Sequence, residues 1–462
     1  MRRVCVIACL FAALGMAEDN RSFSLGDRAR QYLVDLIRLD TINPPGNESK
    51  VAIYLKDVAD SQGIPNELIG SDPKRLNFIA RLRGSGKSRP LLMLAHSDVF
   101  PIDRMQWAVD PFSAELRNGF IYGRGSRDDK ALLAAELAVM VELKRRNIRL
   151  NRDLILLSEA DEEEGSSGIQ WVIQHAWPKI DCEFAINEGG AILEAKDGER
   201  LFEIQTTEKI PTRVVLTARG TATRGTVPRD DNPIIKLSRA VIKLSESEQP
   251  AHLQPTVRRY FRELAKLPEY AWLAPLLTRL ENPATLPAAA NQVRMHDPDL
   301  DSLLRTTVSP TVVQAGAKIN LIPNKAEAQV DVRRLPGETR EDVLDRIRQI
   351  INDPSIEMEP VPAPQVPFTD PSSVLTPLYK AMERAINRVY PRDTISPYMS
   401  RATTDAPFLR IRGVAVYGVP LFTRDPGENV AHGPDEKISP KNVEDGVGLL
   451  WQMVLETGGN GV

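Results

Sequence analysis

Five side chains that can bind a metal ion lie at separate points of this chain, each at the end of an apolar run. They are His96, Asp128, Glu163, Glu188 and His432. Neutral imidazole and carboxylate are the ligands of hydrolytic zinc, and two divalent ions about 3.5–4 Å apart convert water into a nucleophile at neutral pH. The residue types and their positions therefore predict a site for two metal ions.

Residues 161–164 form a run of four acids that contains Glu163 and its neighbour Glu162. Most acidic runs are solvated loops. This run comes two residues after the apolar, strand-like residues 154–158, and α/β sheets bind their ligands beyond the carboxyl ends of the strands. Its position therefore strengthens the case for a place in a binding site.

These segments, in this order along the chain, resemble the M20 family of metallopeptidases, which contains carboxypeptidases, aminoacylases, dipeptidases and succinyl-diaminopimelate desuccinylase. The resemblance covers nearly the whole mature chain. It implies that His96, Asp128 and Glu188 hold one metal ion. It also implies that Asp128 bridges to a second ion, which Glu163 and His432 would hold. The expected ions are two Zn²⁺, with Co²⁺ or Mn²⁺ as alternatives.

The resemblance also implies roles for two neighbours of these ligands. Glu162 matches the family's general acid/base, which would take the proton of the attacking water and pass it to the leaving amine. Asp98 would accept the second ring N–H of His96 and so orient that imidazole.

Two further positions match residues that hold the terminal carboxylate of the substrate in related enzymes. They are Asn320, in residues 317–323, and Arg333, in residues 331–337. An arginine presents a planar pair of donors that matches a carboxylate, which would explain selectivity for a free C-terminus. Arg334 could take this role if the register shifts by one residue.

One position departs from the family pattern. Many members carry a histidine that is thought to reach a partner subunit's active site, and residues 220–228 have Arg224 in its place. An always-charged guanidinium can stabilise an oxyanion, but its reach and geometry differ from those of imidazole. A solvent-facing loop arginine is an equally weighted alternative. A homodimer formed through this part of the chain is therefore left open.

The first half of the chain alternates between helical and strand-like patterns. Helices are predicted at residues 28–38, 50–61 and 130–143, and strands at residues 77–82 and 91–95. This alternation predicts an α/β domain with a largely parallel sheet. The resemblance implies a zinc-peptidase-like catalytic domain, made of residues 24–207 and 363–458.

Residues 208–362 have a different pattern and predict a smaller inserted α+β domain. Strands at residues 212–219 and 327–332, with helices at residues 232–244 and 340–351, predict a β-α-β-β-α-β sandwich. In the resembling family this is the lid or dimerisation domain. Residues 249–299 exceed what the sandwich needs and predict a mostly helical excursion.

The N-terminus has the pattern of a signal peptide at residues 1–17. Two arginines precede an apolar stretch, residues 4–16, and a small-x-small cleavage site follows. The stretch is shorter than the roughly 20 apolar residues of a membrane span, so no stable anchor is expected after cleavage. The mature protein would keep only Cys182 and form no intrachain disulfide. We therefore expect an exported protein, periplasmic or secreted.

The composition is that of an ordinary globular protein of more than one domain. The 462 residues are 42% hydrophobic and 26% charged. The formal net charge of −3, from 59 basic and 62 acidic residues, gives no electrostatic reason to expect nucleic acid as a partner.

These features together predict a two-metal hydrolase that cleaves a peptide or N-acyl amide bond next to a free carboxylate. Carboxypeptidase-like and aminoacylase-like specificities both remain open, so the expected substrate is a small peptide or an N-acyl amino acid. A different class of function is a catalytically silent binding protein with a peptidase fold. The complete ligand set and Glu162 argue against it, and Arg224 is the one feature in its favour.

Overall fold

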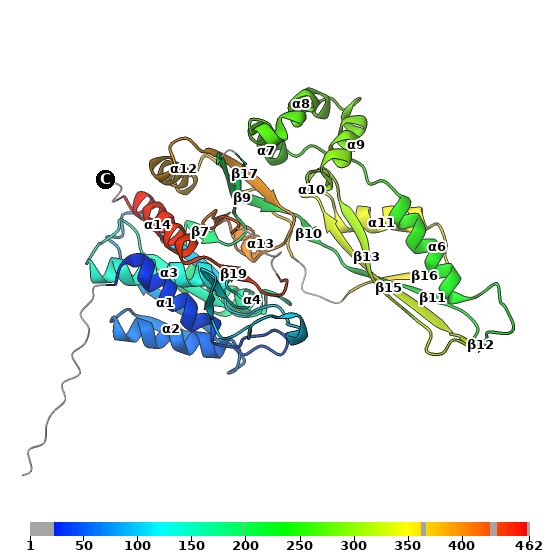
Figure 1. Ribbon diagram of the computed structural model, residues 1–462, viewed down its shortest axis with the longest axis horizontal. Helices are drawn as coiled ribbons and strands as arrows, with labels where there is room; N and C mark the ends of the chain where they lie inside the picture. The colour runs from blue at the N-terminus through cyan, green and yellow to red at the C-terminus, as the bar shows by residue number, and fades with distance from the viewer. Residues whose placement is uncertain (1–22, 197, 362–365, 426–431, 460–462) are drawn as a thin grey trace, which may run out of the picture.

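The computed structural model describes residues 23–196, 198–361, 366–425 and 432–459. Its two large β-sheets each carry their own helices (Figure 1), and two small sheets of two and three strands accompany them. The predicted signal peptide and the predicted boundary at residue 363 lie outside the described residues. Among the described helices, none is both long and apolar enough to cross a lipid bilayer.

The larger sheet has nine strands in the order β1-β2-β6-β3-β7-β18-β9-β17, with β8 beside β9. Their bounds are β1 Asn66–Ile69, β2 Asn77–Leu82, β3 Leu91–His96, β6 Leu154–Glu159, β7 Phe184–Asn187, β8 Ala191–Glu194, β9 Arg200–Glu208, β17 Thr394–Ser400 and β18 Ala415–Gly418. The central strands β6, β3, β7 and β18 are parallel, whereas β1 and β2 pair antiparallel at one edge. The mostly parallel central sheet predicted from the sequence is confirmed.

Helices cover both faces of this sheet, which explains why its central strands are apolar throughout. One face carries α1 Leu25–Ile37, α2 Ser49–Ser61, α3 Lys130–Arg145, α12 Pro377–Val389 and α14 Pro440–Thr457. The other carries α4 Ser167–His175, α5 Trp177–Ile180 and α13 Ala406–Arg410. In β3, Met93 packs on the first face and Leu94 on the second, as the two-residue repeat of a strand requires.

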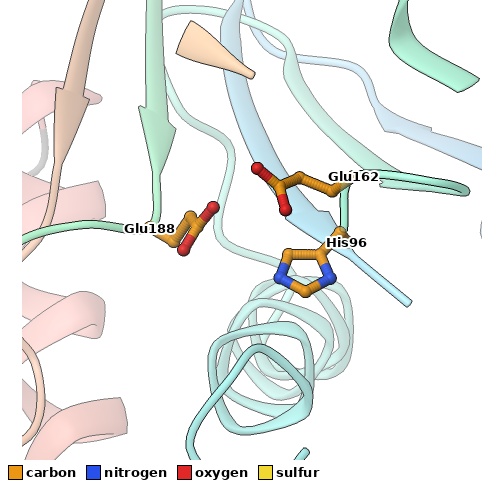
Figure 2. A group of neighbouring side chains, drawn as sticks. All are labelled: His96, Glu162 and Glu188. Atoms are coloured by element: carbon orange, nitrogen blue, oxygen red, sulfur yellow. The ribbon is translucent and has the colours of Figure 1, made fainter. Parts of the chain in front are cut away.

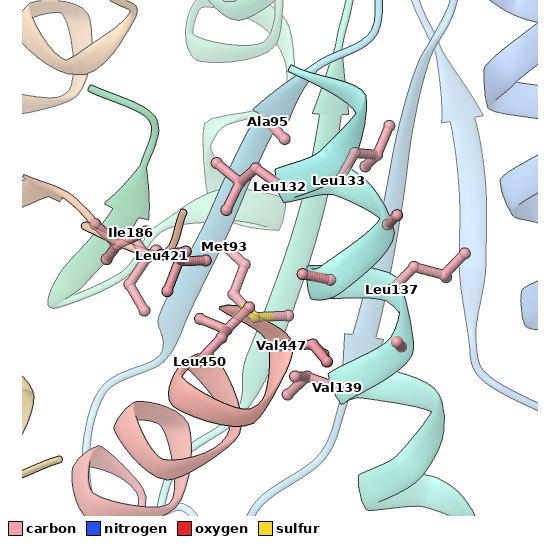
Figure 3. Close-up of a cluster of buried hydrophobic side chains, with 14 of the residues drawn as sticks. Met93, Ala95, Leu132, Leu133, Leu137, Val139, Ile186, Leu421, Val447 and Leu450 are labelled. Carbon is pink, nitrogen blue, oxygen red and sulfur yellow. The ribbon is translucent and has the colours of Figure 1, made fainter. Parts of the chain in front are cut away.

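Helix α3 packs against β3 and β6 of the sheet and contacts helices α1 and α14. Figure 3 shows it beside α14, over the strand that carries Met93. Every residue from Lys130 to Leu143 is buried, so the helix is enclosed all round. This burial gives a rigid support to the loop that precedes the helix and carries Asp128. On the other face of the sheet, the short helices α4 and α5 are separated at Ala176.

The smaller sheet has five strands, with α6 and α11 packed against it. The elements are β10 Ile210–Pro211, β11 Val214–Arg219, α6 Pro233–Glu246, β13 Thr307–Ala315, β15 Lys325–Arg334, α11 Arg340–Ile351 and β16 Ile356–Pro360. The four main strands run antiparallel in the order β16-β11-β15-β13. The chain order β11-α6-β13-β15-α11-β16 is the predicted β-α-β-β-α-β arrangement.

Helices also occupy the predicted excursion. They are α7 Pro255–Leu264, α8 Ala274–Glu281, α9 Leu286–His296 and α10 Pro298–Ser302, with the 3₁₀ helix η2 Pro268–Leu273. Their buried side chains share one cluster with Leu201, Tyr398 and Met399 of the larger sheet. In addition, the Tyr260 hydroxyl donates a 2.6 Å hydrogen bond to Glu203 on β9. The excursion therefore packs on strands β9 and β17 of the larger sheet.

Short elements complete the structure. They are η1 Arg104–Gln106, β4 Leu116–Arg117, β5 Phe120–Tyr122, β12 Thr223–Arg224, β14 Leu321–Ile322 and β19 Lys437–Ile438. Strand β19 pairs with β5, and β12 pairs with β14. The first pairing joins two loops near the larger sheet, and the second forms the far tip of the smaller domain (Figure 1).

Candidate metal centre

Three neighbouring parallel strands end at one place and deliver three of the predicted site residues. His96 is the last residue of β3, Glu162 lies just beyond β6, and Glu188 directly follows β7. Because β3 lies between β6 and β7 in the sheet, these side chains converge over the carboxyl edge (Figure 2). Glu163 comes from the same loop as Glu162.

Two loops from distant parts of the sequence bring Asp128 and His432 to the same place. Asp128 lies between β5 and α3, and His432 precedes β19. The antiparallel pairing of β5 with β19, which sets Tyr122 opposite Lys437, holds these loops side by side. All five predicted metal-binding side chains therefore belong to one cluster.

The carboxylate of Asp128 lies between the two histidines. Its Oδ1 is 3.1 Å from His96 Nε2, and its Oδ2 is 3.0 Å from His432 Nε2. The same His432 nitrogen is 3.4 Å from Glu163 Oε1. Each Asp128 oxygen thus faces a different half of the cluster, as a carboxylate that bridges two ions would.

Two sets of ligand atoms are close enough to surround an ion. Their members lie within 4.8 Å of one another, and the sets are His96 with Glu162 and Glu188, and His96 with Asp128 and Glu163. The first set includes Glu162 beside His96 and Glu188, where the resemblance implied Asp128. The division of the ligands between two ions therefore stays a prediction.

The cluster is rich in buried negative charge, and its protonation reflects this. Burial opposes a charged imidazole, but hydrogen bonds with Asp128 and Asp98 raise the pKa of His96 well above its usual value. Hydrogen bonds with Asp128 and Glu163 raise the pKa of His432 to about 10. Burial and the charge of Asp128 raise the pKa of Glu188. The raised pKa values show that the cluster favours added positive charge. Its imidazole and carboxylate donors are ligands that suit divalent ions.

Asp98 holds two parts of the centre together. His96 Nδ1 is 3.1 Å from the backbone carbonyl oxygen of Asp98 and 3.3 Å from its Oδ1. The two carboxylate oxygens of Asp98 accept the backbone N–H groups of Glu162, at 3.2 Å, and Glu163, at 3.1 Å. Asn43 donates a further 2.8 Å hydrogen bond to it. The predicted orienting role of Asp98 therefore fits this geometry and extends to the Glu162–Glu163 backbone.

Glu436 is a buried residue of the centre to which the sequence reasoning gave no role. It accepts the backbone N–H of Arg127 at 2.7 Å and that of Asp128 at 3.3 Å. The guanidinium of Arg124 donates to Glu436 at 2.8 Å and to the carbonyl of His432 at 2.9 Å. Glu436 therefore fixes the two loops that carry Asp128 and His432. Its position four residues after His432 was the only signal in the sequence.

We expect the substitution Glu436→Gln to weaken metal binding while the fold is retained. The amide replaces one acceptor oxygen with a donor that opposes the N–H groups of the Asp128 loop. Loss of an outer partner of metal ligands lowers affinity by about 10–100-fold. Competition with a chelator measures this affinity. Glu444→Gln is the control, because Glu444 is a half-buried residue of α14 that pairs with Arg30 and lines neither cavity at the metal centre. Wild-type affinity in Glu436→Gln would show that the loops hold their positions without it.

A cavity of about 470 Å³ connects the metal centre with the smaller domain. From the larger domain it is lined by the side chains of Asp128, Glu162, Glu163, Glu188 and His432. From the smaller domain four arginines line it, namely Arg213, Arg333, Arg334 and Arg340. Arg333 is held in place by Asp331, at 2.9 Å, and by Thr403, at 3.2 Å. The cavity therefore joins an acidic region to a basic one.

The structure does not bring Arg224 or Asn320 to this cavity. Both are exposed at the tip of the smaller domain, where β12 pairs with β14. The two lie close together, because the N–H of Gly225 donates to the carbonyl of Asn320 at 2.8 Å. Within one chain they are therefore separate from the metal cluster, and action on a partner subunit stays a prediction.

A family model supplies the identity that this geometry suggests. Residues 92–456 match the model described as peptidase family M20/M25/M40. The chain belongs to this family. It is 28% identical over 381 residues to the N-fatty-acyl-amino acid synthase/hydrolase PM20D1 of Homo sapiens, an alignment that covers 81% of this chain and 75% of the human protein.

Solved structures of M20 proteins share the fold. One is the M20 family metallo-carboxypeptidase Sso-CP2 from Sulfolobus solfataricus, with a TM-score of 0.70, 21% identity and coverage of 93% of this chain and 99% of that one. Another is the YXEP protein of Bacillus subtilis, described as a dinuclear metal-binding peptidase, with a TM-score of 0.60, 15% identity and coverage of 94% and 99%. This M20 chain is thus a hydrolase acting on C–N bonds, and it carries a candidate metal-ligand cluster.

Proposed function

We propose that this M20 enzyme hydrolyses an amide bond next to a free carboxylate and holds two zinc ions. The observation that carries the proposal is that the acidic cluster and Arg333 line the same cavity. Bound ions in such a cluster would polarise the amide carbonyl and lower the pKa of water. His96, Asp128, Glu163, Glu188 and His432 would hold them.

Arg333 would bind the free carboxylate of the substrate. Its guanidinium has five N–H donors, and the contacts with Asp331 and Thr403 orient the group within the cavity wall. A substrate carboxylate can accept two parallel hydrogen bonds from such a group, which an amide cannot match. The distance between Arg333 and the metal cluster would then set which bond lies over the cluster.

Glu162 would move the proton during hydrolysis. Burial, together with the charge of Glu188, raises the pKa of Glu162 well above its usual value, which suits a group that must take up a proton and release it. The proton would come from the attacking water and go to the nitrogen of the leaving amine. The bond from the Glu162 N–H to Asp98 would keep the carboxyl at the cavity wall.

The acyl part of the substrate separates two candidate activities. A C-terminal peptide and an N-acyl amino acid both release an amino acid with a free carboxylate, so Arg333 serves either. The human relative, named for N-fatty-acyl-amino acids, supports N-acyl amino acids, which we propose as the substrate class. The similarity to the Sulfolobus carboxypeptidase fold keeps carboxypeptidase activity as the second candidate.

The substitution Arg333→Ala tests this function. We expect KM to rise roughly 10- to 100-fold, as for the loss of a charged hydrogen bond of ~1.5–3 kcal/mol. The preference for an N-acyl amino acid over the corresponding amide should fall at the same time, because only the acid presents a carboxylate. Steady-state kinetics with both substrates provide the measurement.

Arg219→Ala is a matched control for this test, because Arg219 is exposed on β11 and pairs with Glu357 rather than lining the cavity. An unchanged acid-to-amide preference in Arg333→Ala would remove Arg333 from carboxylate binding. Bound metal without hydrolysis of any N-acyl amino acid or blocked dipeptide would instead favour the silent binding protein.

We also propose that the protein is exported to the periplasm or secreted. The proposal is supported by the charge and apolar pattern of residues 1–17, which lie outside the described residues. N-terminal sequencing of the mature protein tests it, and an intact residue 1 would contradict it.

A homodimer through the smaller domain is a further proposal, supported by the exposed pair Arg224 and Asn320 at its tip. The mass of the particle in solution tests it, and a monomer at working concentration would contradict it.

A further inference from the structure

A second cavity, of about 220 Å³, opens on the metal centre from another direction. It shares Asp128 and Glu188 with the larger cavity but is otherwise lined by different residues. We propose that this second cavity binds the hydrocarbon acyl chain of the substrate. The inference rests on the proposed function, which it extends to the acyl group.

The two cavities could bind the two parts of the substrate, the amino acid and the acyl group, separately. The proposed function puts the amino acid part in the larger cavity, where Arg333 binds its carboxylate. If Asp128 and Glu188 hold ions that polarise the amide carbonyl, the acyl substituent of the amide would lie on the side away from Arg333. The second cavity begins at the same two carboxylates, so it is positioned to take that substituent.

One side of the second cavity is formed by four apolar side chains. Leu132, Val419 and Leu421 line it and are nearly inaccessible to solvent, and Phe422 lies beside them. Leu132 and Leu421 belong to the buried cluster drawn in Figure 3. Burial of methylene groups against such side chains is favourable and requires no polar partner.

The turn after β7 adds only backbone to this wall. Gly189 lines the cavity with a φ of 99°, and a Cβ there would lie 1.9 Å from Oε1 of Gln205. A side chain at this position would therefore be excluded by both the backbone conformation and the packing. The same turn carries Glu188, so the wall next to this carboxylate consists of glycine backbone.

Arg127 and Asp129 also line the second cavity, but neither indicates that the acyl group is charged. Arg127 donates to the carbonyl of Thr423 at 3.0 Å, and its guanidinium lies 5.8 Å from the ring centre of Phe422. Asp129 is buried and has one carboxylate oxygen without a hydrogen bond among the described residues. A substrate with a terminal amine could use that oxygen, and this alternative is an arm of the test.

The size of the cavity limits the chain that it can enclose. A volume of about 220 Å³ corresponds to roughly seven methylene groups, if each fills the ~30 Å³ share of a water molecule. Full burial of one methylene corresponds to a gain of about fourfold. The dependence on chain length should therefore be steep at first and level off near an octanoyl chain.

The first test measures kcat/KM of the metal-loaded wild-type enzyme for N-acetyl, N-butanoyl, N-hexanoyl, N-octanoyl and N-dodecanoyl forms of one amino acid. All substrates are used below their micelle concentrations. We expect a rise of at least about tenfold from acetyl to octanoyl and little change beyond it. Dipeptides with a free amine and the same C-terminal residue are compared in parallel.

The second test places one large-to-small substitution in each cavity. Phe422→Ala removes part of the proposed acyl wall, and Phe408→Ala makes the same change in the larger cavity. We expect Phe422→Ala to lower the octanoyl-to-acetyl ratio by on the order of tenfold. Phe408→Ala should change kcat/KM by the same factor for every chain length. Thermal unfolding verifies that both variants are folded.

The outcomes separate this inference from the proposed function. Hydrolysis of the acetyl substrate with no gain from longer chains would overturn the acyl site and leave the proposed function standing. A free-amine dipeptide that exceeds every acyl substrate would also overturn it, in favour of Asp129 as an amine partner. Failure to hydrolyse any N-acyl amino acid would contradict the proposed function itself.

Discussion

Replacement of Glu162 with glutamine is expected to lower turnover by on the order of 10²–10⁴-fold while both metal ions stay bound. Glutamine has nearly the same shape but cannot take up and release a proton. The backbone bond from Glu162 to Asp98 does not involve its side chain, so the loop should keep its position. Turnover of an N-acyl amino acid and metal analysis of the same sample provide the two measurements.

The neighbouring Glu164 is a matched control for this substitution. It belongs to the same acidic run and also lines the larger cavity, but it is exposed and absent from both sets of candidate ligands. We expect Glu164→Gln to stay within a few-fold of wild-type turnover. If Glu162→Gln were equally active, another group would have to move the proton. If it lost metal, Glu162 would act as a ligand beside His96 and Glu188, which the geometry permits.

Replacement of Asp128 with alanine is expected to lower occupancy at both metal positions. Its two oxygens face His96 and His432 separately, so one carboxylate serves both halves of the cluster. Without the Asp128 carboxylate, His96 and His432 would lose the ligand that lies between them. Metal analysis after dialysis should therefore show loss of both ions, whereas His432→Ala should empty chiefly one position.

Asp129→Asn is the control for this prediction. Asp129 is the adjacent buried acid, yet it is absent from both sets of candidate ligands. It should keep both ions, which separates the loss of a ligand from the loss of a nearby negative charge. Two tightly bound ions in Asp128→Ala would refute the bridging assignment.

The sequence by itself indicated the elements that form the metal centre. Helix α3 was predicted at residues 130–143 and extends over Lys130–Arg145. The strands that end near His96 and Glu162 were visible because strands buried on both faces are continuously apolar. Such patterns reflect the burial of each segment, which can be read from the residue types within that segment.

Strand β9 shows where this reasoning fails. Glu203, Gln205 and Glu208 lie within it and are buried, although such residues usually indicate a surface. Their burial depends on distant partners, since Tyr260 donates to Glu203 and Gln205 donates to Glu208. The packing of the helical excursion on β9 could not be predicted either, because it also depends on partners that are distant in the sequence.

The tertiary structure alone decided which segments meet. The pairing of β5 with β19 brings Asp128 to His432, and Glu436 secures both loops. The smaller domain presents Arg333 to the cavity but leaves Arg224 and Asn320 at its tip, although all three residues lie in recognisable motifs. The type and spacing of side chains along the chain indicate which residues are buried and which can bind a metal ion or a substrate. The contacts between residues hundreds of positions apart arise only from the way the sheets are ordered and the domains are packed.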